Sequence, residues 1–218
     1  MSDGSRFWTD DLWVAALLSA AAGFADAVGY VKSGVFAANM TGNTVLAGLS
    51  LAAGKWEIAA QRGMTLAAFC VGVAVASLSL RLARGRPAVP LIGEAVLVLA
   101  SALAEARLNL SIALIAAAMG MQAVAVTRFR SVVASTVVVT STMARLSEFA
   151  LGWCIAQAEA RAAAAKIAPS LLAAIWAAYG LGAIAAALAM PAMAEPLLLP
   201  AAMLLLVAII LGLRNARS

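Results

Sequence analysis

The sequence has 218 residues, of which 65% are hydrophobic and 11% charged, and its mean hydropathy is +1.00. A soluble domain normally carries about 25% charged residues, so the composition excludes a soluble class and predicts a single transmembrane domain over residues 1–218. The net charge of +5 comes largely from arginines at the ends of apolar segments, which is typical of membrane orientation and not of nucleic-acid binding.

The chain has no histidine, and its two cysteines, Cys70 and Cys154, lie far apart within apolar runs. The usual general base, proton shuttle and commonest metal ligand are therefore missing, and the cysteine spacing fits neither a zinc site nor a disulfide framework. The sequence has no Ser/Lys pair at a plausible catalytic spacing. We therefore expect neither an enzyme nor a bound metal or cofactor.

The first predicted transmembrane helix covers about residues 12–31 and contains Gly-Phe-Ala-Asp-Ala at residues 23–27. Asp26 lies about two helical turns inside the end of this helix. A carboxyl group at that depth normally faces protein or water and not lipid. Asp26 is therefore a candidate for coupling a proton or a sodium ion to transport. The alternative is that it caps or bridges helices.

A polar stretch, VFAANMTGNT at residues 35–44, comes next in the chain. Its amides and hydroxyls are costly against lipid unless they are paired. We expect a helix that begins at Thr41, where side chains offer a cap and the first backbone N–H groups lack helical partners. Such a helix start at membrane depth would form a site for an anionic or polar group.

Three more transmembrane helices are predicted over about residues 63–82, 89–104 and 110–127. Glu94 lies inside the second of these, and we expect Gln122 or a hydroxyl group to be its structural partner. The β-branched stretch that follows the last of these helices favours an extended chain. A helical pattern starts again at Thr140 or Ser141, and an interfacial helix and two closing spans are then predicted over about residues 157–166, 169–190 and 197–213.

The two halves of the chain, about residues 12–106 and 109–213, share a pattern at an offset of about 97 to 99 residues. In each, an apolar helix with a glycine and a polar residue precedes an extended piece, a hydroxyl-rich break and a helix. We predict an all-α polytopic membrane protein with about six transmembrane helices and two broken (extended-then-helix) segments, arranged as inverted repeats. Chance similarity between apolar segments is the alternative origin of the pattern.

The positive charges place the C-terminus in the cytoplasm. If both broken segments re-enter without crossing, the N-terminus is cytoplasmic too, and 11 of the 15 Lys and Arg residues lie inside. A seven-span chain with an external N-terminus satisfies the charges equally well but loses the inverted symmetry. The symmetry favours the six-span arrangement.

In this arrangement the broken segments meet near the membrane midplane, with their extended pieces paired and their helix starts facing one cavity. Each helix N-terminus carries a partial positive charge of about half an elementary unit. The alternative is that the polar residues only hold helices together. The predicted substrate-binding residues are Asn39, Thr41, Gly42, Asn43 and Thr44 from one side and Thr140, Ser141 and Thr142 from the other, with Asp26 and Gln122 lining the cavity.

The sequence at residues 23–27, followed by GVFAANMTGNT at residues 34–44, resembles the hallmark of the YoaK-type family of small bacterial membrane proteins. AMGMQ at residues 118–122 resembles the second motif of that family, although Ala123 and Thr140-Ser141 stand where the family usually has asparagine and a Thr-Gly pair. The resemblance covers essentially the whole chain. It implies a multi-pass protein of the bacterial inner membrane without an assigned function. The extended-then-helix pattern also resembles the crossed segments of sulfate, bicarbonate and uracil permeases.

We expect a small integral membrane transporter or channel-like permease for a small anion or polar solute, working in the lipid bilayer. Because six spans are few for a transporter, we expect a homodimer. The alternative is a structural or regulatory membrane protein, such as a subunit of a complex, without transport activity.

Overall fold

A computed structural model describes residues 3–104, 106–125, 128–129, 132–133, 135–137, 139–154 and 169–215. These residues form eight helices and one short hairpin, which confirms the predicted all-helical class. The predicted interfacial helix at residues 157–166 lies outside the described residues. The helices are α1 (Asp3–Ser33), α2 (Met40–Ala52), α3 (Trp56–Leu82), α4 (Ala88–Leu103), α5 (Leu108–Ala125), α6 (Val139–Cys154), α8 (Pro169–Ala189) and α9 (Leu198–Asn215), and the strands are β1 (Arg128–Phe129) and β2 (Val132–Val133).

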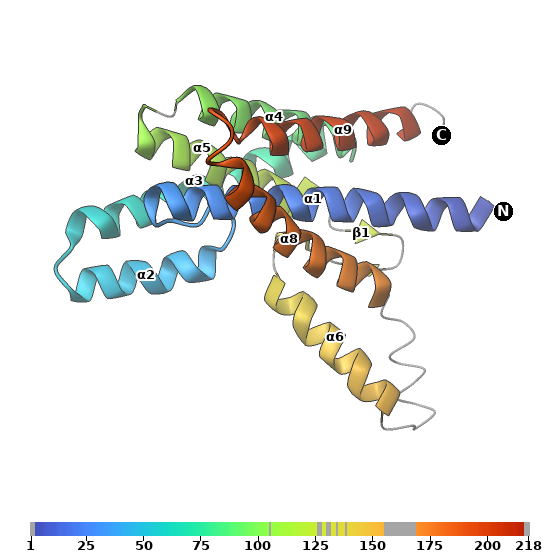
Figure 1. Cartoon of the computed structure of the whole chain (residues 1–218). Coiled ribbons are helices and arrows are strands. Elements are labelled where there is room, and N and C mark those ends of the chain that lie inside the picture. Colours follow the sequence, from blue (N-terminus) through green and yellow to red (C-terminus); the bar gives the residue numbers. More distant parts are fainter. Residues whose placement is uncertain are drawn as a thin grey trace.

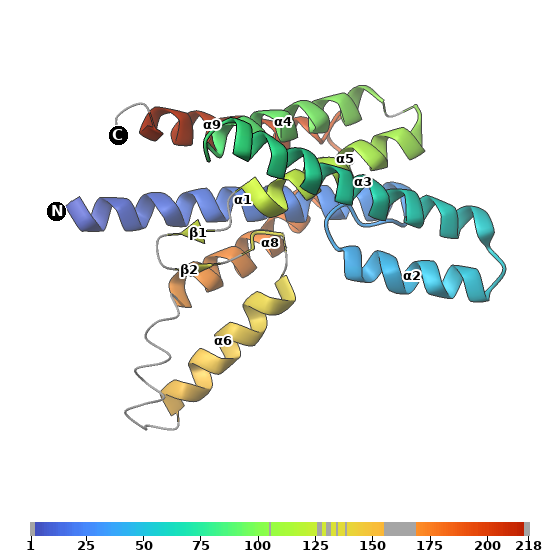
Figure 2. The ribbon, with the colours of Figure 1, turned by 180° about the vertical axis from the view of Figure 1, so that it is seen from behind.

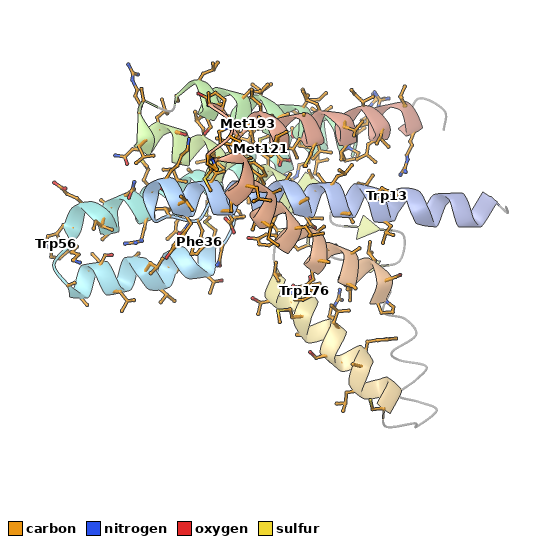
Figure 3. The ribbon with its side chains drawn as sticks, in the orientation of Figure 1. Trp13, Phe36, Trp56, Met121, Trp176 and Met193 are labelled. Carbon is orange, nitrogen blue, oxygen red and sulfur yellow. The ribbon has the colours of Figure 1, made fainter. Side chains whose placement is uncertain are left out.

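Four of the helices, α1, α3, α5 and α8, have apolar stretches long enough to cross a membrane, while α4 and α9 are shorter apolar helices. Large apolar side chains cover the outside of the molecule, and Leu103 is 92% exposed. A lipid environment accounts for such an exterior, which is rare on soluble monomers. Trp13 and Trp56 are exposed and lie toward opposite ends of the molecule, as interfacial anchors do (Figure 3).

Helix α1 runs through the middle of the molecule and packs against α8, α9 and α5 (Figure 1). Helix α3 packs against α5 and α4, and α4 packs against α5 and α9. Helix α2 packs on α3, and α6 packs on α8. Both chain ends lie at the same end of the bundle, and the view from behind shows that α2 and α6 start near the middle and run toward opposite ends (Figure 2).

The break between α1 and α2 follows from local chemistry. Gly34 has a φ of +67°, a left-handed conformation that glycine adopts without steric cost, and its N–H donates to the carbonyl of Tyr30 at 2.8 Å. The chain then turns back, and the amide of Asn43 closes the turn by pairing with the backbone of Phe36. Helix α2 starts at Met40, one residue before the predicted Thr41.

The expected pairing of the two extended pieces with each other is wrong. Strand β1 pairs antiparallel with β2, so the hairpin lies within the second broken segment (Figure 2). In the first segment, the side chain of Asn43 donates to the carbonyl of Phe36 at 2.7 Å and accepts from its N–H at 2.9 Å. This side chain takes the place of a neighbouring strand, so the first segment needs no β partner there.

Two close helix crossings, α1 with α8 and α3 with α5, hold the centre of the bundle. Each crossing contains a glycine from both helices. Each glycine lies against a backbone carbonyl of the opposite helix, so that an added Cβ would overlap that carbonyl oxygen. The contacts are Gly23 with Tyr179 and Gly182 with Ala20 in the first crossing, and Gly72 with Ala117 and Gly120 with Phe69 in the second.

Candidate functional site

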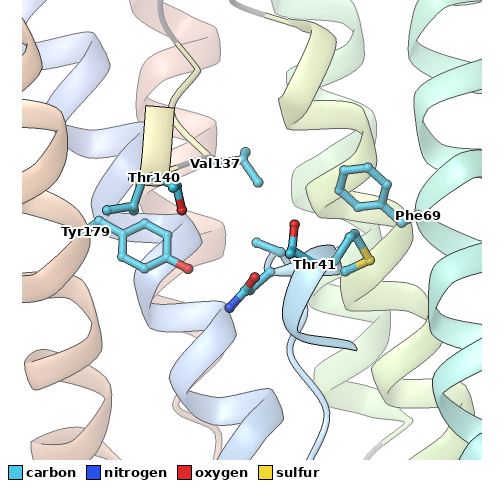
Figure 4. A pocket seen from close by; sticks show the side chains of 9 residues that line it. Thr41, Phe69, Val137, Thr140 and Tyr179 are labelled. Carbon is cyan, nitrogen blue, oxygen red and sulfur yellow. The ribbon is translucent and has the colours of Figure 1, made fainter. Parts of the chain in front are cut away.

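A pocket of about 320 Å³ lies where the first turns of α2 and α6 approach each other. Its walls come from four helices and from the segments that lead into α2 and α6. Figure 4 shows Thr41 and Thr140 at this space, with Tyr179 and Phe69 on its two sides. The lining residues are Ala38, Asn39, Met40, Thr41, Phe69, Val137, Val139, Thr140 and Tyr179.

The start of α2 is fixed by its own side chains. Asn39 is the N-cap residue, and its side-chain oxygen accepts from the N–H of Gly42 at 3.1 Å. This bond satisfies one of the N–H groups that a helix start leaves without a helical partner. The hydroxyl of Thr44 donates back to the carbonyl of Met40 at 2.9 Å.

Asp26 ties the first broken segment to two helices. Its carboxyl accepts hydrogen bonds from the backbone N–H groups of Ala38 and Asn39, the latter at 3.3 Å, and from the hydroxyl of Tyr179. The Asp26 side chain is 5% exposed. Asp26 therefore lies directly behind the pocket lining and bonds to residues that form it. It joins three elements: α1, the segment that leads into α2, and α8.

Gln122 anchors the second broken segment in a similar way, by hydrogen bonds. Its amide nitrogen donates to the carbonyl of Leu18 on α1 at 2.8 Å and to the hydroxyl of Thr136 at 3.0 Å. Thr136 precedes the pocket residue Val137 in the lead-in to α6, and both are buried. A polar side chain from the preceding helix thus holds each lead-in, Asp26 in the first half and Gln122 in the second.

Three of the predicted substrate-binding residues line the pocket: Asn39, Thr41 and Thr140. The other five lie close by in the chain but have different surroundings. Gly42 donates its N–H to Asn39, Asn43 is fully buried against Phe36, and Thr44 is exposed. In α6, Ser141 is exposed and Thr142 is buried.

Sequence reasoning missed the aromatic walls, Phe69 and Tyr179, and the apolar lining residues beside them. One signal was available for Tyr179. It is one of two tyrosines in the chain and stands in the middle of a strongly apolar span, where a hydroxyl group needs a partner. Phe69 gives no such signal, because an aromatic residue in an apolar helix is ordinary.

The pocket has mainly apolar walls with a few uncharged polar groups. None of its lining side chains is ionisable at neutral pH, and the polar groups are an amide, two aliphatic hydroxyls and a phenol. The first turns of α2 and α6 direct their positive dipole ends toward this space. No group of three metal-ligating side chains occurs among the residues that the structure describes. The amide, hydroxyl and phenol groups of the pocket can donate and accept hydrogen bonds.

These features define a class: an all-helical protein of the membrane type, in which two short helices start at one shared pocket. Within this class, residues 14–210 match a family described as "Protein of unknown function (DUF1275)", and the chain belongs to that family. This confirms the predicted membership of a family without an assigned function. Comparisons with curated proteins and with solved structures find no match, so the likeness to permeases stays a prediction.

Proposed function

We propose that this protein is a small transporter or channel-like permease for a small anion or polar solute, bound in the pocket between the starts of α2 and α6. The observation that carries the proposal is that residues of both first turns line one pocket, although about 100 residues separate them in the chain. Two helix N-termini at one site favour an anion or a hydrogen-bond acceptor without any nearby arginine.

The proposal includes an inverted-repeat arrangement, which the packing of the helices supports. Helices α1, α2, α3 and α4 correspond in order to α5, α6, α8 and α9, and the packing of α1 on α8 has its counterpart in that of α5 on α3. The glycine contacts repeat as well, since Gly23 meets the carbonyl of Tyr179 while Gly120 meets that of Phe69. The side chains of Tyr179 and Phe69 both line the pocket. Pockets between inverted repeats are the usual substrate sites of transporters.

The proposed orientation has six crossing helices in the bacterial inner membrane and both termini in the cytoplasm, with a homodimer as the working unit. The two chain ends lie at the same end of the bundle, which supports an even number of crossings (Figure 1). Reporter fusions at each terminus test this, and we expect both to report a cytoplasmic location. An external N-terminus would contradict the six-span arrangement.

Flux through proteoliposomes tests the transport activity. With a panel of small anions and neutral polar solutes, we expect uptake of at least one, and Thr41→Val and Thr140→Val should each reduce it. Loss of one hydrogen bond at a neutral site corresponds to about a three- to tenfold weaker interaction. Thr44→Val is the matched control, because Thr44 lies on the same helix as Thr41 but does not line the pocket, and its hydroxyl bonds to its own helix. An equal effect of all three variants would contradict a site in the pocket.

A structural or regulatory role without transport is the second candidate. It is favoured by the number of polar groups that bond within the protein, such as Asn43 with Phe36 and Gln122 with Thr136. Folded protein that moves none of the solutes, with variants that change only stability, would support this role over transport.

A further inference from the structure

Glu94 stands apart from the pocket and its supporting bonds. It lies on α4, and its side chain is fully buried. Neither carboxyl oxygen has a hydrogen-bond partner among the residues that the structure describes. This overturns the expectation that Gln122 or a hydroxyl would bond to it: the Gln122 amide nitrogen donates to Leu18 and Thr136.

The surroundings of Glu94 are apolar. Its neighbours along the buried face of α4 are Leu91, Ala95 and Val98, which belong to the hydrophobic core shared with α1, α5 and α9. The opposite face of α4 carries exposed Ile92 and Val96. The Glu94 carboxyl therefore belongs to the interior of the bundle and not to its lipid-facing side.

Among the side chains that the structure describes, the helices around Glu94 place no ionisable partner against it. Helix α5 has no ionisable side chain. In α9, Arg214 lies in the last turn. It follows Gly212 by two residues, and Gly212 lies beside Ala88 of α4. Ala88 is about 9 Å along α4 from Glu94 at 1.5 Å per residue. In α1, the carboxyl of Asp26 is occupied by the hydroxyl of Tyr179. The ionisable residues of α3 are Glu57, Arg62, Cys70 and Arg81, of which Arg62 bonds to Ser50 and Gly34.

We propose that Glu94 is a proton-binding site, separate from the pocket, which holds its proton while the bundle of α1, α4, α5 and α9 is closed. An ionised carboxylate without a partner is far more costly in an apolar interior than the neutral acid. Release of the proton to water, leaving a carboxylate, requires water to reach this face of α4. Proton exchange at Glu94 is therefore linked to opening of the bundle.

Buried hydroxyls mark the route for that water. Ser101 lies on the same face of α4 as Glu94, about 10 Å further along the helix, and its hydroxyl bonds to the carbonyl oxygen of Ser111 on α5 at 2.9 Å. Ser111 in turn lines a small cavity with Lys32 and Ser33 at the end of α1. The volume of this cavity is about 10 Å³, close to the minimum for one water molecule. The proton thus exchanges with the aqueous phase at the end of the bundle where α1 ends.

Infrared spectroscopy of the purified full-length protein tests the site without any transport assay. We expect the wild-type spectrum at neutral pH to contain the carbonyl band of an un-ionised carboxyl group that is missing from Glu94→Gln and that shifts in heavy water. The Asp26 carboxyl is common to both proteins and cancels in the difference. Glu94→Leu is the second variant, since it removes no hydrogen bond and replaces the acid by an apolar side chain of similar volume; the same band should vanish.

The route is tested by the rate at which this band shifts after transfer to heavy water. Ser101→Ala should slow the shift about tenfold or more, whereas Ser79→Ala should not, because the Ser79 hydroxyl bonds within α3. A wild-type spectrum in which Glu94 contributes carboxylate bands, or no difference from Glu94→Gln, would overturn the proton site. Equal exchange in Ser101→Ala and wild type would overturn the route.

Discussion

Replacing Asp26 by alanine is expected to destabilise the protein more than any other single change at the candidate site. The substitution leaves three donors without their acceptor: the N–H groups of Ala38 and Asn39 and the hydroxyl of Tyr179. A buried donor that loses its partner costs about 1–3 kcal/mol, so a loss of about 3 kcal/mol or more is expected. Thermal unfolding of the purified protein in detergent measures it.

Asp26→Asn separates the anchoring role of this residue from a role in coupling. The asparagine keeps one oxygen for the N–H of Ala38, and its amino group has the Tyr179 hydroxyl as an acceptor, so the fold should be retained. The titratable proton is lost. If Asp26 couples a proton or a sodium ion to transport, the variant abolishes the dependence of flux on pH or sodium. Unchanged dependence in a folded variant would leave Asp26 as an anchor alone.

Tyr179→Phe is the matched control for Asp26→Asn. It keeps the aromatic wall of the pocket and removes the hydroxyl that donates to Asp26. We expect a moderate loss of stability, of about 1 kcal/mol for one hydrogen bond, with the coupling dependence retained. A loss of the dependence in both variants would locate the coupling in the hydrogen bond itself.

The broad architecture was predictable because it follows from length and hydropathy. The apolar runs are long and end at arginines, glycines or prolines, so the observed limits of α4, α5, α8 and α9 differ from the predicted ones by about two residues. Helix α3 was predicted too short. It starts at Trp56, because the polar residues Glu57, Gln61 and Arg62 continue the helix beyond its apolar part. Charged residues mark the limit of an apolar segment but do not end a helix.

The pocket was predictable only in outline. The polar stretch at residues 35–44 and the hydroxyls after residue 139 identify two helix starts, but their chemistry does not say which side chains turn inward. Asn43 was an obvious candidate for binding, yet its amide closes the turn on Phe36. Phe69 and Tyr179 enter the pocket through the crossings of α3 with α5 and of α1 with α8. Those crossings depend on tertiary contacts that helix periodicity alone does not reveal.

The glycine crossings give the most discriminating test of the fold, because matched glycines occur in the same helices. A Cβ at position 182 of α8 would overlap the backbone carbonyl of Ala20 on α1, whereas a Cβ at position 180 meets no atom within 4 Å. Backbone atoms cannot move aside as a flexible side chain does, so Gly182→Ala must separate the two helices. We expect it to lower stability by about 1–3 kcal/mol, as overpacked cores do.

Gly180→Ala should instead leave stability unchanged or raise it, because alanine favours a helix over glycine by about 1 kcal/mol. The second crossing offers the same comparison in α3, with Gly72→Ala against Gly63→Ala. A Cβ at position 72 would overlap the backbone carbonyl of Ala117, whereas a Cβ at position 63 meets no atom within 4 Å. Thermal unfolding of the four variants measures the effects. Because the Gly23 contact in the same crossing positions Tyr179, Gly182→Ala should also weaken solute binding, which Gly180→Ala should not. Similar unfolding midpoints for Gly182→Ala and Gly180→Ala would contradict the close crossing of α1 with α8, and with it the geometry that brings Tyr179 to the pocket.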